Sequence, residues 1–307
     1  MTREIEQHGM TPIFVLGQQR SGTTWVANML AAHPKIAGVQ AIEHHGIHES
    51  VFFSHFAREY GDLKQDDNLT RFLRDFTASD YFLITGLNPL WLKEQRPESY
   101  EQAFRIVMDE FARQRGADHW VEKSPHHTLL ADEIKQLFPD AWFIGIVRKP
   151  DDQIISQLKL HKNARESLIR RWAIYVRKAG AWSLYARFLQ RFCKSNPRCI
   201  CLNYEVLKAN PAREMRRIAD TLGITYTEKM LSPSYRPNTS FSSSAERKLA
   251  VGNLERAICA GISYGMSVIP ISILRRLEAW RREKRGIDWP DWVWKRLTRS
   301  YSKNPAS

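Results

Sequence analysis

Eight residues near the start of the chain have the types and spacing needed to hold an anion. The segment Gly17–Thr24 reads GQQRSGTT; it follows the apolar run TPIFVL at Thr11–Leu16 and precedes a helical pattern. In such a loop, successive backbone N–H groups and the N-terminus of the next helix form a nest for a phosphate or sulfate group. Gly17 and Gly22 have the spacing of the glycines in a phosphate-binding loop.

Position 23 discriminates between two kinds of chemistry. A nucleotide triphosphatase needs a lysine there to reach the β- and γ-phosphates, whereas this chain has Thr23 and carries its cation inside the loop as Arg20. No apolar strand ending in Asp offers a convincing magnesium ligand. The loop therefore favours a smaller anion held without a metal, with a P-loop kinase or triphosphatase as the alternative.

Three further segments place polar residues at the ends of predicted strands. The run IGIVRKPDDQIIS ends a strand in Arg148 and places Ser156 on the helix that follows. The tetrapeptide EKSP, at Glu122–Pro125, follows the strand pattern HWV and contains Lys123. The tripeptide NYE, at Asn203–Glu205, closes the apolar run CICL.

Together with RSGTTW at Arg20–Trp25, these segments resemble the PAPS-dependent sulfotransferases, where PAPS is 3′-phosphoadenosine 5′-phosphosulfate. The resemblance covers about residues 11–225 and is to the bacterial and Golgi-type branch, which includes tyrosylprotein and carbohydrate sulfotransferases. It implies in-line transfer of the sulfuryl group from PAPS to a hydroxyl or amine, with a general base, PAP as product and no metal. The acceptor stays open: a small molecule, a carbohydrate, a lipid or a peptide.

The resemblance also implies roles for individual residues. The residues implied for the 5′-phosphosulfate are Arg20, Ser21, Gly22, Thr23, Thr24 and Trp25. Arg148 and Ser156 would hold the 3′-phosphate, and Tyr204 would lie near the nucleotide. Arg20 and Lys123 would stabilise charge as the S–O bond breaks, although a surface ion pair is the simpler interpretation of Lys123.

A general base must take the proton of the acceptor as sulfur is attacked. Glu43 is our candidate, because it follows the loop, the helix and the second strand by about the interval of the catalytic Glu in the tyrosylprotein-type enzymes. The neighbouring His44, His45 and His48 are the alternatives, since other branches of the family use histidine.

Short apolar strands that alternate with helical patterns predict an α/β fold of three layers around a mostly parallel sheet. The expected strands are Thr11–Leu16, 36–40, His119–Lys123, Trp142–Val147 and Cys199–Leu202. We expect one domain over residues 1–307. Residues 45–118 would form a helical insertion on the acceptor side, and residues 230–307 a loop with a basic helical cap.

The two halves of the chain differ in charge. Residues 1–150 carry 16 Lys and Arg against 20 Asp and Glu, and residues 151–307 carry 30 against 13, which gives the net charge of +13. A basic half favours an anionic partner, but a solvated surface accounts for it equally well. A non-catalytic binder of nucleic acid or other anions is thus a second alternative, although the chain has no recognisable nucleic-acid motif.

The remaining features bear on location. The four cysteines Cys193, Cys199, Cys201 and Cys259 form no CxxC pair, and we expect core residues in a reducing compartment. No signal-peptide pattern or long apolar run is visible, which predicts a cytoplasmic protein. Residues 257–285 are moderately apolar and flanked by arginines, so they could contact a membrane peripherally, although a packed cap is the favoured interpretation. The oligomeric state is left open.

Overall fold

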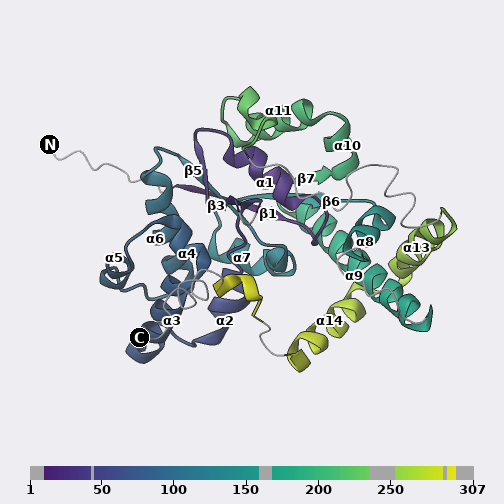
Figure 1. The fold of residues 1–307 in the computed structure, drawn as a ribbon, viewed down its shortest axis with the longest axis horizontal. Helices are drawn as coiled ribbons and strands as arrows, with labels where there is room; N and C mark the ends of the chain where they lie inside the picture. The colour runs from purple at the N-terminus through teal and green to yellow at the C-terminus, as the bar shows by residue number, and fades with distance from the viewer. Residues whose placement is uncertain (1–9, 43–44, 159–167, 235–252, 286–288, 295–307) are drawn as a thin grey trace, which may run out of the picture.

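The computed structural model describes residues 10–42, 45–158, 168–234, 253–285 and 289–294 (Figure 1). Within them, a five-stranded sheet has the order β2-β5-β1-β6-β7, and every neighbouring pair is parallel. The strands are β1 (Thr11–Leu16), β2 (Ile36–Gly38), β5 (His119–Lys123), β6 (Trp142–Val147) and β7 (Cys199–Asn203). A separate antiparallel pair joins β3 (Gln40–Ala41) to β4 (Gly46–Ile47).

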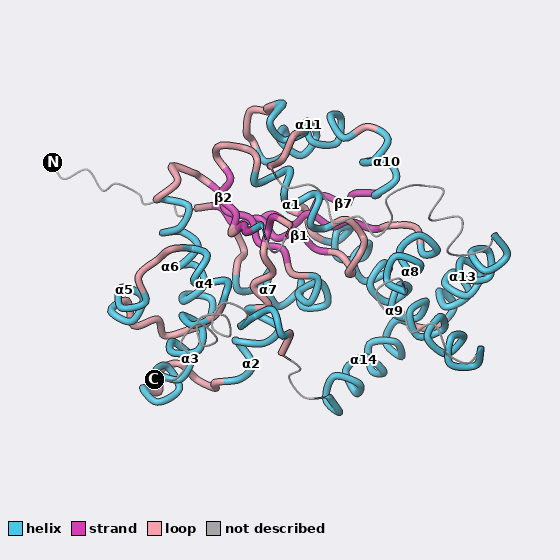
Figure 2. The backbone as a smooth tube through the Cα atoms, in the orientation of Figure 1, coloured by secondary structure: helices cyan, strands magenta, loops and turns pink. Residues whose placement is uncertain are grey.

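Alternate side chains of β1 enter two different hydrophobic cores. Ile13 and Val15 pack with α1 and α11, whereas Phe14 and Leu16 pack with α6, α7 and α9. This follows from the two-residue period of a strand, which sends successive side chains to opposite faces of the sheet. Figure 2 shows the two groups of helices on opposite sides of the strands, which confirms the predicted three-layer α/β fold. These helices are α1 (Thr23–Ala31), α6 (Tyr100–Arg113), α7 (Ala131–Leu137), α9 (Leu168–Ser195) and α11 (Pro211–Leu222).

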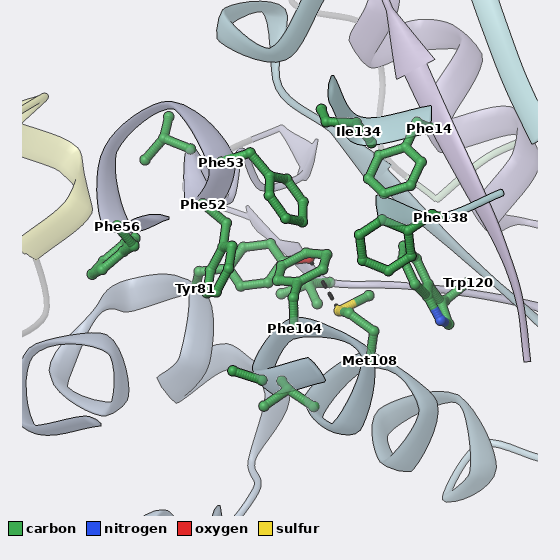
Figure 3. Packing of buried hydrophobic residues seen from close by; sticks show 14 of the residues in the cluster. Phe14, Phe52, Phe53, Phe56, Tyr81, Phe104, Met108, Trp120, Ile134 and Phe138 are labelled. Atoms are coloured by element: carbon green, nitrogen blue, oxygen red, sulfur yellow. Dashed lines mark hydrogen bonds between the residues drawn. The ribbon is translucent and has the colours of Figure 1, made fainter. Parts of the chain in front are cut away.

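Residues 45–118 are mainly helical, as the amphipathic spacing predicts. Their helices before α6 are a π-helical turn at Phe52–Phe56, α2 (Ala57–Glu59), α3 (Asp66–Ala78), α4 (Asp80–Thr85) and α5 (Pro89–Glu94). An aromatic core joins this segment to the sheet (Figure 3). The ring of Phe104 lies 4.7 Å from that of Phe52 and 5.7 Å from that of Trp120, so the helical segment packs directly against β5.

The second half of the chain completes the fold. Its other helices are α8 (Pro150–Leu158), α10 (Tyr204–Ala209), α13 (Asn253–Gly265) and α14 (Ile271–Arg285), with 3-10 turns at Glu228–Leu231, Met266–Val268 and Asp291–Trp294. A further 3-10 turn, Pro125–Leu130, follows β5 in the first half. In the part of the chain that the structure describes, no single helix is long and apolar enough to cross a membrane. Together, α13 and α14 have the length and composition of a membrane span, but a bend of 106° separates them.

Two local expectations differ from the structure. The first helix begins at Thr23 rather than Trp25, because Gly22 in a left-handed conformation (φ 105°) already ends the loop. Cys199 and Cys201 share a face of β7 that the core covers only in part: Cys199 packs partly buried against it and Cys201 is exposed, whereas Ile200 and Leu202 on the other face are buried. The reason is that β7 lies at the edge of the sheet.

The aromatic core gives a prediction about stability. Phe104 is fully buried, so Phe104→Ala leaves a cavity between α6 and β5 and should lower the free energy of unfolding by about 3–5 kcal/mol. Leu90→Ala is the matched control, because Leu90 is 66% exposed and its truncation should cost under about 0.5 kcal/mol. Denaturant unfolding followed by circular dichroism measures both, and equal losses would contradict this packing.

Candidate active site

The candidate site lies where the parallel strands end. The register pairs Val15 with Lys123 and Val147 with Asn203, so the carboxyl ends of β1, β5, β6 and β7 meet at one edge of the sheet. Open parallel sheets bind ligands at this edge, because the loops there are free of the core. The loop Gly17–Gly22, Lys123, Arg148 and Tyr204 all follow or close these strands.

The loop after β1 has a backbone shape that depends on two left-handed residues. Arg20 has φ 70° and Gly22 has φ 105°, so the backbone turns sharply before α1 begins. A Cβ at Gly22 would lie 2.6 Å from Cδ2 of Tyr204, and only glycine fits there. Thr128 anchors the start of the loop, because its hydroxyl accepts from the Gly17 amide at 2.9 Å and donates to the Gly17 carbonyl at 3.1 Å.

Arg20, Arg148, Ser156 and Tyr204 come together around this loop. Nε of Arg20 donates to Oγ of Ser156 at 3.0 Å, and a guanidinium nitrogen of Arg148 donates to the Arg20 carbonyl at 3.0 Å. The Arg148 guanidinium lies 4.3 Å above the Tyr204 ring, and the Tyr204 ring in turn meets Trp25 edge-on at 5.9 Å. Residues from four elements thus form one cluster, as the resemblance implies.

The electrostatics of this cluster favour an anion. Burial and the neighbouring charge of Arg148 lower the pKa of Arg20, but an arginine guanidinium stays charged at neutral pH. Two other polar atoms, Oγ of Ser21 and Nε of Arg148, are buried and have no hydrogen-bond partner among the described residues. Because unsatisfied buried donors are costly, the cluster is built to receive acceptor oxygens.

Two glutamines that the sequence analysis did not identify hold the loop from the side. On α8, Gln153 donates to the Gln18 side chain at 2.7 Å and to the Gln19 carbonyl at 3.1 Å, and Gln157 donates to the same carbonyl at 2.9 Å. With Ser156 they occupy one face of α8, at the i, i+3, i+4 spacing that a helix brings together. That spacing was the available signal for these glutamines, but the loop residue Gln19 that Gln153 contacts lies 134 residues away in the sequence.

Lys123 makes the second part of the site, at the end of β5. Its side chain is 3% exposed, and its ammonium nitrogen lies 2.8 Å from Oε1 of Glu49, whose side chain is 23% exposed. Lys123 is therefore not in a surface ion pair, and Glu49 is a polar partner that the sequence analysis missed. Glu49 carries no local motif; its position becomes evident only when the loop before Phe52 is folded onto β5.

A buried network below Lys123 sets the position of this loop. The carboxylate of Glu122 accepts hydrogen bonds from Ser50 at 2.7 Å, from Ser124 at 2.5 Å and from Nδ1 of His127 at 3.0 Å. The backbone amide of Phe53 donates to Nε2 of His127 at 3.1 Å, which places the imidazole proton on Nδ1. Burial opposes the charge on Glu122, but His127 and the two hydroxyls outweigh it and lower the pKa of this carboxyl.

The remaining predicted residues are placed as follows. Thr23 is buried and Thr24 half-buried at the start of α1. Glu43 and His44 lie outside the described residues, so their roles stay predictions. The His45 carbonyl accepts from Nδ2 of Asn28 at 2.9 Å.

His48 and the question of a metal can be considered together. His48 is buried against the rings of Tyr81 and Trp292, at 5.9 and 5.2 Å. Among the described residues, no three His, Cys, Asp or Glu side chains gather into a group that could hold a metal ion. The metal-free reaction itself stays a prediction.

Comparison with known proteins identifies the class to which this fold and site belong. The sequence model of the sulfotransferase family matches residues 12–228, more than half of the chain, and the chain therefore belongs to the sulfotransferase family. No curated protein sequence matches it significantly.

The similar solved structures are distant in sequence. The sulfotransferase domain of a Synechococcus olefin synthase is 18% identical with a TM-score of 0.50, over 85% of this chain and 97% of that domain. A sulfotransferase from Mycobacterium tuberculosis is 17% identical with a TM-score of 0.46, over 83% and 77% of the two chains. A retinol dehydratase, solved with androsterone and PAP, is 16% identical with a TM-score of 0.37, over 73% and 63%.

The Glu122 network gives a prediction with a defined pH dependence. Glu122→Gln replaces a charged acceptor and should lower the free energy of unfolding at pH 7 by about 1.5–3 kcal/mol. Because the pKa of Glu122 is lowered in the folded state, its stabilisation is present above its ordinary pKa of 4.5 and is lost as pH falls through the folded value.

The measurement is denaturant unfolding of both proteins from pH 7 to about pH 3. The difference between wild type and variant should shrink toward the acid end. A difference independent of pH would show that the charge on Glu122 does not contribute. Glu133→Gln is the control, because Glu133 pairs with Arg58 at an exposed position.

Proposed function

We propose that this chain transfers the sulfuryl group of PAPS to a hydroxyl or amine acceptor, in line and with a general base. The observation that carries the proposal is the anion site formed by the loop after β1 with Arg148 and Ser156. Its two guanidiniums lie close together, and buried Oγ of Ser21 and Nε of Arg148 have no hydrogen-bond partner among the described residues. Membership of the sulfotransferase family supports the same reaction class.

The residues present fit the two anionic ends of such a nucleotide. The backbone of the loop after β1, with Arg20 and Ser21, fits the 5′-phosphosulfate, since its amides and the α1 N-terminus favour negative charge. Arg148 fits the 3′-phosphate because it is buried at the end of β6 and still has an unused donor. The rings of Tyr204 and Trp25 provide an aromatic surface beside it.

The alternative of a kinase or triphosphatase finds no support in this loop. Thr23 is buried, and its methyl group packs where a side chain at Gly17 would otherwise lie, 2.8 Å from a Cβ built there. Thr23 therefore packs against the loop and does not take the place of a phosphate-binding lysine.

The chemistry asks three things of the chain once the sulfuryl donor is bound. A carboxylate takes the acceptor proton as the acceptor oxygen or nitrogen forms its bond to sulfur. Arg20 and Lys123 stabilise the negative charge that grows on the 5′-phosphate oxygen as its bond to sulfur breaks. The donor supplies the sulfuryl group, and no covalent bond to the protein is needed.

Glu49 joins Glu43 as a candidate for the base. Its carboxylate lies beside Lys123 and remains partly open to solvent, so a base and a charge-stabilising cation stand together at the end of β5. Glu43 lies outside the described residues and keeps its place on the resemblance to the tyrosylprotein-type enzymes. We favour Glu49, because the Glu122 network fixes its loop to β5.

The proposal is tested by incubating the full chain with PAPS labelled in the sulfuryl group and an extract of the source organism. A labelled product identified by mass is the expected result and reveals which kind of acceptor is used. If label never leaves PAPS while the protein binds DNA with steep salt dependence, the chain is a non-catalytic anion binder. Transfer that requires ATP and Mg²⁺ would instead indicate a kinase.

The 3′-phosphate assignment predicts nucleotide selectivity. Without metal, PAP should bind in the micromolar range, and ADP should bind more weakly by about 2–4 kcal/mol because it leaves Arg148 unpaired. Arg148→Gln should remove most of this difference while changing ADP affinity far less. Titration calorimetry measures both ligands, and equal affinity of the unmodified protein for PAP and ADP would refute the assignment.

A matched variant controls for the loss of a stacked arginine. Arg198 stacks on Trp142 at 5.3 Å, just before β7 and away from the carboxyl edge of the sheet. Arg198→Gln should leave the ratio of PAP to ADP affinity unchanged.

The base assignment predicts a separation of binding from turnover. Glu49→Gln should lower turnover of the labelled acceptor by about 10²–10⁴ and leave PAP affinity within a few-fold, because a base acts only as the acceptor attacks. Arg20→Ala should instead weaken both binding and turnover.

Three variants and one control test other candidates for the base. Glu43→Ala, His44→Ala and His45→Ala are measured in the same assay, with Glu133→Gln as the control for a remote ion-paired carboxylate. If Glu49→Gln keeps near-normal turnover and Glu43→Ala is inactive, Glu43 is the general base. An inactive histidine variant would give it to that histidine.

A further inference from the structure

The helices α13 and α14 lie against α8 and α9, on the side of the molecule opposite the helices α3–α6 (Figure 1). Cys259 of α13 is buried with Ile154 and Tyr175, and Leu274 of α14 is buried as well. Between the helices, Arg187 of α9 donates to the Ile269 carbonyl at 2.6 Å and holds the bend. The pair is therefore docked on the domain through one face.

A second face of this pair is apolar and open to solvent. Its exposed side chains, with exposed fractions, are Tyr264 (57%), Val268 (83%), Ile273 (48%), Leu277 (57%) and Trp280 (55%). The Tyr264 ring also meets the Trp182 ring of α9 edge-on, at 5.6 Å between ring centres. On α14, residues 273, 277 and 280 share one face, since i, i+4 and i+7 repeat with the helix turn. Large apolar side chains are exposed elsewhere too, but at scattered positions, whereas these five follow one another along two joined helices.

Positive charge surrounds this apolar face. The segment Ile271–Arg285 carries six Arg or Lys and two Glu. Arg275, Arg276 and Lys284 are exposed, and the Lys284 ammonium lies 4.3 Å from the centre of the Trp280 ring. Glu278 pairs with Arg281 at 2.9 Å, so the acidic charge on this turn is already neutralised.

We infer that the α13–α14 face binds the surface of an anionic membrane. A helix with apolar side chains on one face and flanking cations lies in the headgroup region, where the apolar residues enter the acyl boundary and the cations meet lipid phosphates. Tryptophan and tyrosine suit that depth because their rings are apolar with one polar atom. The bend of 106° fits a pair lying along a surface rather than crossing it.

A second copy of this chain is a less fitting occupant. A two-fold contact through the same face would bring the cations of one α14 against those of the other, and like charges at an interface oppose association. An anionic lipid surface instead complements both the apolar stripe and the charge. The inference is independent of the transfer reaction, since it concerns a face made by α13 and α14 alone.

Flotation of the full-length protein with vesicles tests this. The protein should float with phosphatidylcholine vesicles that contain about 30% phosphatidylserine at about 0.15 M salt, and should stay at the bottom with phosphatidylcholine alone. Leu277→Ser with Trp280→Ser should lower the partition constant by about tenfold or more. Arg275→Gln with Arg276→Gln should lower it by about 25-fold, or about fivefold for each charge.

Leu90→Ser is the matched control, because Leu90 is an equally exposed leucine on α5. It should float like the unmodified protein. PAP affinity and the melting temperature of every variant are measured alongside, so that loss of fold or of nucleotide binding is seen separately from loss of flotation.

Three results would overturn the inference. The unmodified protein could stay at the bottom with anionic vesicles. Leu90→Ser could lose flotation as much as the α14 double variant. Sedimentation could show a dimer that the α14 variant dissociates, with no vesicle binding, and the face would then belong to an interface between copies.

Discussion

The parallel alignment of β1 with β5 and β6 is the constraint on which the rest of the site depends. Because Phe14 pairs with Glu122 and Val15 pairs with Lys123, the two residues of β5 lie level with the last residues of β1. A slip of one residue would exchange the faces of Glu122 and Lys123. The carboxylate would then lose its buried hydroxyls, and the ammonium would leave the sheet edge for the core. The apolar residues on both faces of β1 exclude such a slip, since each face is buried against its own layer of helices.

Two buried charged groups at this edge of the sheet are stabilised in opposite ways. The Glu122 carboxylate is satisfied within the protein, by Ser50, Ser124 and His127, and acts as a fixed anchor. The Arg20 guanidinium, by contrast, lies near a second cation: burial and the charge of Arg148 lower the pKa of Arg20, and the buried Nε of Arg148 has no hydrogen-bond partner among the described residues. A closed network holds the structure, whereas an open positive cluster suits the proposed binding of an anion.

The sequence predicted the strands well because their signals are local. The runs TPIFVL, HWVEK and WFIGIV became β1, β5 and β6 with the expected ends, since short apolar runs buried on both faces have few other structures available. Contacts between segments that are distant in the sequence were harder to predict. The pairing of Lys123 with Glu49 spans 74 residues, and no motif marks Glu49. Arg20 and Ser156 could be brought together only through the family resemblance, because 136 residues separate them.

The two sides of the site come from different segments of the chain. The side of the site that carries Arg20, Arg148 and Tyr204 is built from the β1–α1 loop, from β6 with α8, and from the start of α10, which are all short connections of the sheet itself. Glu49 comes instead from the loop that leads into the helical segment 52–113, whose aromatic core packs on β5. The Glu122 network ties this loop to β5 through the Val51 amide and the Ser50 hydroxyl. The helices beyond Phe53 can therefore differ in shape between acceptors while Glu49 and Lys123 keep their places, because the anchor lies before those helices begin.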